Sequence, residues 1–166
     1  ACGNPIFPVF AQKGFFDPLF AVALALGKAL ALDCLRIWWL WTVLQSIIFF
    51  LGLHGFLRLR MGAGRLPWIL ASAGQVLFLF WQMQAGTPCL AYLPLAAAFL
   101  ARWIGDCAAG ILRPGRIHAC ALSAGLLTVS GGLFPGLLSF VLAGSLAAVV
   151  ERRRLGRCLS GLLTFP

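Results

Sequence analysis

The chain has 166 residues, enough for one soluble domain of ordinary size, but its composition excludes a water-soluble fold. Apolar residues make up 61% of the chain and charged residues 10%, against roughly 45–50% and about 25% in soluble globular proteins. The formal net charge of +9 does not indicate nucleic-acid binding, because almost no solvated surface remains on which a basic face could form. The continuous apolar runs therefore predict an all-α integral membrane protein without a nucleic-acid partner.

The N-terminal part of the chain divides into a tail and two apolar runs. Residues 1–17 are predicted to form a proline-containing tail, and residues 18–166 a single helical membrane domain. The run 18–32 is short for a membrane span and predicts a helix that ends at an interface or lies along it. The run 37–57 carries no formal charge and has the length that a membrane-spanning helix needs.

The remaining apolar runs are longer than one helix needs. An arginine-rich stretch follows the first predicted span and predicts a cytoplasmic or matrix loop: Arg58, Arg60 and Arg65. The uncharged run 66–101 would overshoot the bilayer as one helix, so we expect a break near residues 85–88. The uncharged run 117–150 is interrupted by a loop signal at residues 130–136. The expected total is about five helices, at least three of them spanning.

Arg102 is the most informative residue for function. It lies within apolar surroundings, where an arginine near the membrane centre costs about 2.5–3.5 kcal/mol and indicates a functional site. Asp106 follows one helical turn later, so a structural Arg–Asp pair is a second interpretation. An interfacial arginine whose side chain extends to the headgroups is a third. Small residues beside them give a flat face that another helix could approach closely: Gly105, Ala108, Ala109 and Gly110.

The segment around Arg102 also resembles a known family. Its pattern is Arg102-x-x-Gly105-Asp106-x-x-Ala109-Gly110. This pattern is similar to the signature helix of subunit a of the F-type (mitochondrial) ATP synthase, with Asp106 in the place of the family's Asn. The resemblance covers somewhat less than half of the chain. It implies that the last two helices are long and tilted and form a hairpin over residues 90–155.

The resemblance implies a proton-translocating stator subunit that has no catalytic site of its own. Two half-channels would meet a rotating ring of proteolipid subunits. Arg102 would separate them and attract each passing rotor carboxylate, a task that suits a permanently charged guanidinium. The implied proton path consists of Asp106, His118, Ser145 and Glu151, and the implied close rotor contacts are Gly105, Ala109 and Gly110. For Glu151 an ion pair with adjacent arginines at headgroup level is the alternative.

The same resemblance implies partners and a location. The partners would be the proteolipid c-ring, the other stator subunits of the ATP synthase and membrane lipids. The chain would be a multi-pass protein of the mitochondrial inner membrane, or alternatively of a bacterial inner membrane. Neither a cofactor nor a metal ion is expected.

A function of a different class fits the composition as well. Few charges, several short helices and a proline-containing tail are typical of an accessory structural or quinone-proximal membrane subunit of a respiratory complex. A small membrane enzyme is disfavoured, because the sequence shows neither paired carboxylates nor a Ser/His constellation. The surroundings of Arg102 separate the first two functions, since the stator subunit needs a ring of proteolipid helices beside it.

Overall fold

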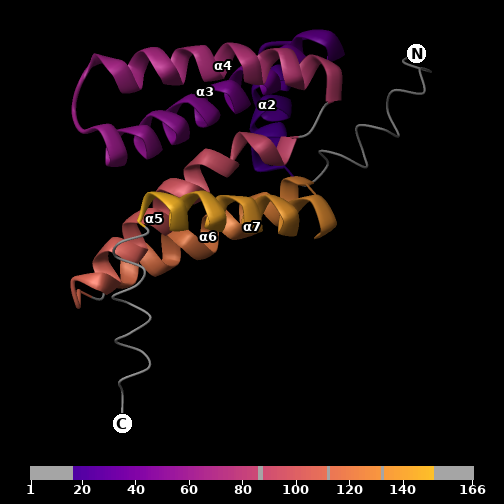
Figure 1. The fold of residues 1–166 in the computed structure, drawn as a ribbon. Coiled ribbons are helices and arrows are strands. Elements are labelled where there is room, and N and C mark those ends of the chain that lie inside the picture. Colours follow the sequence, from indigo (N-terminus) through magenta and orange to yellow (C-terminus); the bar gives the residue numbers. More distant parts are fainter. Residues whose placement is uncertain (1–16, 86–87, 112, 132, 152–166) are drawn as a thin grey trace.

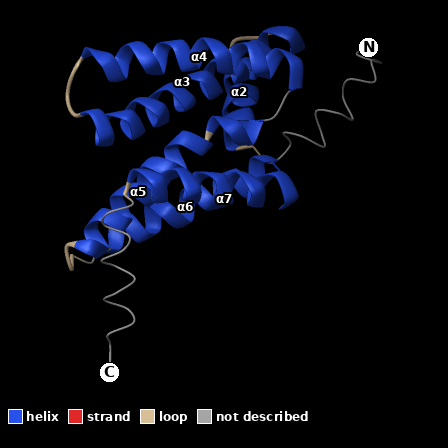
Figure 2. Cartoon of the chain, viewed as in Figure 1, coloured by secondary structure: helices blue, strands red, loops and turns tan. Residues whose placement is uncertain are grey.

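The computed structural model describes residues 17–85, 88–111, 113–131 and 133–151, and this part of the chain is all-helical, as predicted (Figure 2). The predicted tail lies outside the described residues except for Asp17. In chain order the elements are α2 (Pro18–Ala29), α3 (Cys34–Met61), α4 (Arg65–Ala85), the 3₁₀ helix η1 (Pro88–Ala91), α5 (Leu93–Ala108), α6 (Pro114–Gly131) and α7 (Leu133–Val150).

Two predicted breaks are confirmed. Helix α4 ends at Ala85 and η1 begins at Pro88, which divides the uncharged run 66–101 into two helices. Helix α6 ends at Gly131 and α7 begins at Leu133, so a helix boundary falls inside the predicted loop signal, but residues 130–131 and 133–136 are helical and the predicted seven-residue loop is wrong. Local turn chemistry was sufficient to locate both positions.

The prediction that residues 90–155 form one hairpin of two long helices is wrong. The helix that carries Arg102 ends at Ala108, and a separate helix begins at Pro114. Within the described part of the chain there are six α-helices, and three of them fall in the predicted hairpin. None of these three has more than 18 residues.

A glycine cap explains why α5 ends early. Gly110 has a φ of 69°, in the left-handed region that only glycine adopts at little cost. The N–H of Gly110 donates to the carbonyl of Cys107 at 3.0 Å, and the N–H of Ile111 donates to the carbonyl of Asp106 at 2.9 Å. These two bonds form a Schellman C-cap. Pro114 then starts α6, a position where its missing N–H is not needed.

The helices form two packed groups (Figure 1). Helices α3 and α4 run antiparallel in one group, and α5, α6 and α7 make up the other. Helix α3 joins the groups, because it packs against α4 on one side and α5 on the other. Helix α2 packs against α3.

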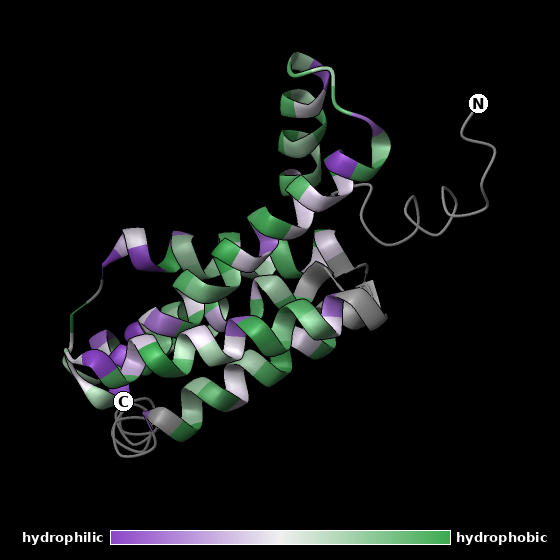
Figure 3. Ribbon diagram, turned by 90° about the horizontal axis from the view of Figure 1, so that it is seen from above, coloured by the Kyte–Doolittle hydropathy of each residue, from purple (hydrophilic) through white to green (hydrophobic). Residues whose placement is uncertain are grey.

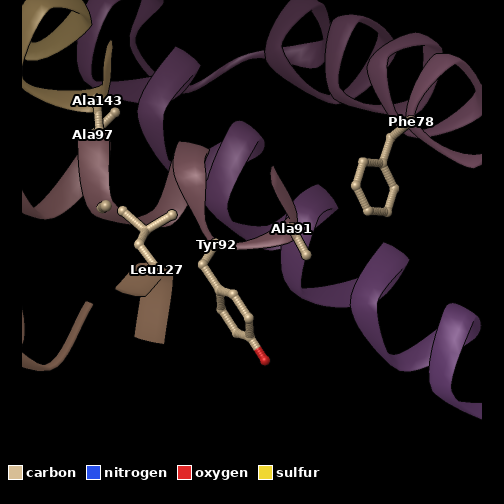
Figure 4. Packing of buried hydrophobic residues seen from close by; sticks show 7 residues of the cluster. Phe78, Ala91, Tyr92, Ala97, Leu127 and Ala143 are labelled. Carbon is tan, nitrogen blue, oxygen red and sulfur yellow. The ribbon is translucent and has the colours of Figure 1, made fainter. Parts of the chain in front are cut away.

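The core between these helices is built mainly from small residues. Ala91, Ala96, Ala97 and Ala143 are fully buried, and they belong to one cluster with three large buried side chains. Figure 4 shows those large side chains, Phe78, Tyr92 and Leu127. Small side chains let helix backbones approach closely, which is how helices associate in membranes.

Gly52 marks a close backbone approach between the two groups. A Cβ atom at this position of α3 would lie 2.6 Å from the backbone nitrogen of Leu95 and 2.9 Å from its Cα. Because both are backbone atoms, a side-chain rotation could not relieve the clash. Glycine at residue 52 therefore sets the distance between α3 and α5.

Hydrophobic residues run along most of the helices (Figure 3). Large apolar side chains are widely exposed, up to 71% at Leu77 and 74% at Val149. By length and composition one described helix, α3, is able to span a membrane, whereas α2 and the segment Leu137–Val149 are apolar but shorter. On this criterion the described helices provide fewer spans than the three predicted.

Candidate functional site

Most of the residues predicted to act together line one cavity. It has a volume of about 510 Å³ and lies where α3, α5 and α7 end and α6 begins. Figure 1 shows these helix ends on one side of the molecule. The lining residues are Leu59, Ala101, Arg102, Gly105, Asp106, Ala108, Ala109, Arg116 and Glu151. The cavity thus brings together two guanidinium groups and two carboxylates.

The cation that pairs with Asp106 is Arg116 rather than Arg102. The Nε of Arg116 lies 3.0 Å from Oδ2 of Asp106, and both side chains are partly buried. This oxygen accepts no hydrogen bond of good angle from the described residues, so the contact is ionic. Among the described residues no hydrogen bond or ion pair of Arg102 is found, and the predicted Arg102–Asp106 pair does not form.

Arg102 lies near the charged end of the bundle rather than at its middle. It shares the cavity with Leu59, which follows the uncharged run 37–57 of α3. Its side chain is exposed. The described arginines at this end are Arg58, Arg60, Arg65, Arg102, Arg113 and Arg116, and we call this region the arginine-rich end. This position fits an arginine near a helix end rather than one at the middle of a helix bundle.

The other predicted residues lie apart from this cavity. His118 is exposed on α6, and Ser145 is exposed on α7, where its Oγ donates to the carbonyl of Val141 at 2.9 Å. Gly110 belongs to the C-cap of α5. Because α5 ends at Ala108, His118 does not continue the helical face of Arg102, as a single long helix would have required.

A second polar cluster, absent from the sequence prediction, is centred on Asp17. This carboxylate is 1% exposed and accepts hydrogen bonds from Trp41 Nε1 at 2.8 Å, from Gln45 Nε2 at 2.8 Å and from the Tyr92 hydroxyl. It also caps α2 by accepting a hydrogen bond from the backbone N–H of Leu19 at 3.0 Å. The cluster therefore ties α2 to α3 and to the start of α5.

The cluster extends from Asp17 into α4. Gln82 Nε2 donates to Gln45 Oε1 at 2.7 Å, and Gln45 Nε2 donates to Asp17, so Gln82 is linked to the carboxylate through the Gln45 amide. Burial and the Asp17 carboxylate raise the pKa of the Tyr92 hydroxyl, which lies in the connection before α5, and this group stays a donor. A carboxylate with four donors and almost no exposure has no access to substrate, so its role is structural.

One sequence signal could have located Asp17. An Asp directly before a Pro is typical of a helix N-terminus, with the carboxylate as N-cap and the proline at the first helical position. The sequence prediction began the helical domain at residue 18, where α2 begins, but it did not assign the N-cap role to Asp17. The partners Trp41, Gln45 and Tyr92 lie far along the chain and depend on the packing of the helices.

No three His, Cys, Asp or Glu side chains of the described residues gather into a group that could hold a metal ion.

Comparison with known proteins adds no family to this description. No family model matches the sequence, and neither a curated protein nor a solved structure shows significant similarity to it.

Proposed function

We propose that the chain is a multi-helix integral membrane protein with a structural role, an accessory subunit whose arginine-rich end faces the cytoplasm or matrix. The observation that carries this proposal is that large apolar side chains are exposed while polar side chains are buried, the reverse of the usual arrangement in a water-soluble protein. Large apolar residues such as Leu77, Leu122 and Val149 are exposed, whereas Asp17 and Gln45 are buried. A water-soluble monomer rarely exposes so many large apolar side chains, whereas lipid or neighbouring helices would cover them.

The distribution of charge supports the orientation. Six described arginines gather at the arginine-rich end, against Asp106 and Glu151. The opposite end, where α2 ends and α3 begins, carries only Lys28, Asp33 and Arg36 among the described charged residues, apart from the buried Asp17. Arginine-rich connections stay on the non-translocated side of a membrane.

The side chains best suited to catalysis support a structural role. Asp17 is sealed in its hydrogen-bonded cluster. The ring of His54 lies against Trp68, with centroids 4.2 Å apart, and stacks on Phe50. Asp106 is held by Arg116. In the described part of the chain these groups stabilise helix packing, and none of them forms a nucleophile–base pair.

Single cysteines at the two ends test the membrane orientation. In a variant whose six native cysteines are replaced by serine, we expect Ala63→Cys to react with a membrane-impermeant maleimide only from the cytoplasmic side of a bacterial host. Leu30→Cys, which is exposed at the opposite end, should react only from the periplasmic side. The chain should also stay in the membrane fraction after carbonate extraction. Release by carbonate, or labelling of both positions from one side, would contradict the proposal.

The subunit role is tested by the size of the native particle. Isolated in a mild detergent from its own membranes, the chain should migrate with a larger assembly. A particle of the size of one chain would contradict this part of the proposal and leave the membrane orientation standing.

A proton-conducting stator subunit of an ATP synthase is the second candidate. It is favoured by the cavity that brings Arg102, Asp106 and Glu151 together. In this function Arg102→Lys should abolish ATP-driven proton pumping by the assembled complex, because a lysine lacks the planar, permanently charged guanidinium that would separate the half-channels. Arg36→Lys, at the opposite end, is the matched control and should pump normally. Normal pumping by the Arg102→Lys variant would exclude this function.

A further inference from the structure

We infer that the cavity at the arginine-rich end binds the phosphate group of an anionic phospholipid, with Arg102 as the principal ligand. This inference rests on the proposed membrane location of the chain. It assigns to Arg102 a role that differs from the stator function. The shared chemistry of the ligand is a phosphate oxyanion, which a free phosphate ion would also provide.

Arg102 is the cation of this cavity that is available to a ligand. No hydrogen bond or ion pair joins its guanidinium to another described residue, and its side chain is exposed at the cavity wall. The carboxylate of Asp106, which would repel a phosphate, is neutralised by Arg116 at 3.0 Å. A guanidinium presents paired N–H donors that match the oxygens of a phosphate.

The charge around the cavity favours an anion over a zwitterion. Four further described arginines lie at the arginine-rich end without lining the cavity: Arg58, Arg60, Arg65 and Arg113. With the two arginines of the cavity they make six positive charges against Asp106 and Glu151, a difference of +4 for the described residues. Such a cluster at a membrane surface attracts anionic lipids.

The position of the cavity suits a lipid rather than only a dissolved ion. Leu59 lies just beyond the uncharged run 37–57 of α3, where the hydrocarbon layer would end and the phosphates begin. Trp103 and Ile111, close to Arg102 along the chain, expose apolar surface that acyl chains could contact. A tryptophan is typical of this interfacial level.

Lipid titrations of the purified full chain test the inference. In a neutral detergent, phosphatidylglycerol should raise the Tm, whereas phosphatidylcholine should not. Arg102→Gln should bind phosphatidylglycerol about fivefold more weakly, the factor expected for one arginine at a membrane surface. Arg36→Gln is the matched control and should keep the wild-type affinity, because Arg36 lies at the opposite end beside Asp33.

Several outcomes would overturn the inference. One is equal affinity of the wild type and the Arg102→Gln variant for phosphatidylglycerol. Another is a wild type that does not prefer phosphatidylglycerol over phosphatidylcholine. A third is an equal Tm shift with inorganic phosphate alone, which would identify a free-anion site.

If Arg102→Gln does not fold, the wild type still provides a test. Its affinity for phosphatidylglycerol should fall as the salt concentration rises, because salt screens exposed charges, and an unchanged affinity would contradict the inference. Carbonate extraction does not depend on this site, so a failure here is distinguishable from a failure of the proposed function.

Discussion

Replacing Asp17 with asparagine should lower the free energy of unfolding by about 2–4 kcal/mol, because it removes a charged acceptor from a buried hydrogen-bonded cluster. The donors Trp41 Nε1, Gln45 Nε2 and the Tyr92 hydroxyl all point at this carboxylate. An asparagine has one acceptor oxygen, and its NH₂ group would face donors. Buried donors without an acceptor are costly because no water reaches them. Unfolding in detergent micelles, followed by tryptophan fluorescence, measures the loss.

Asp33→Asn is the matched control for this change. Asp33 is also the N-cap of a helix and accepts a hydrogen bond from the backbone N–H of Arg36 at 2.8 Å. Its side chain is 62% exposed, and its ion pair with Arg36 is at the surface. We expect a loss of no more than about 1 kcal/mol, since asparagine is itself a good N-cap and exposed ion pairs contribute little. Equal losses at residues 17 and 33 would show that the buried cluster adds no stability beyond capping.

Replacing Gly52 with alanine should be the most damaging of the glycine-to-alanine changes in α3, at a cost of about 1–3 kcal/mol. The added Cβ would meet the backbone of Leu95 at 2.6 Å, so α3 and α5 must separate. This separation would also disturb the alanine core, where Ala96 and Ala97 are fully buried. The measurement is the free energy of unfolding of each variant under identical detergent conditions.

Gly55→Ala, one helical turn away, is the control for the effect of alanine on the helix itself. A Cβ at this position meets nothing within 4 Å. Alanine is favoured over glycine inside a helix, so this variant should gain up to about 1 kcal/mol. If Gly52→Ala is as stable as Gly55→Ala, the close approach of α3 and α5 does not limit packing.

Helix boundaries that depend on local chemistry were largely predictable from the sequence. Pro88 and the glycines near residue 131 placed two breaks correctly, because proline and glycine act within a few residues of themselves. The C-cap at Gly110 was missed, although Gly110 followed by Pro114 is a common helix-stop signal. The resemblance of this segment to a longer helix outweighed that signal.

The partners of charged groups could not be predicted in the same way. Arg116 reaches Asp106 only because α6 turns back beside α5, and Tyr92 reaches Asp17 only when three helices are packed. Sequence spacing favoured Arg102 as the partner of Asp106, because the two residues are one turn apart on one helix. Spacing gives proximity along a helix, but the direction of a side chain depends on its tertiary neighbours.

The hydrogen bond between Tyr92 and Asp17 has a consequence for the biogenesis of the protein. The two residues are 75 positions apart, so the ribosome has produced α2, α3 and α4 before the last donor of the Asp17 carboxylate exists. Until then the emerging chain carries an incompletely satisfied charge among apolar helices. In the proposed membrane location, we therefore expect α2, α3 and α4 to settle in the bilayer only after the segment that carries Tyr92 has packed against them.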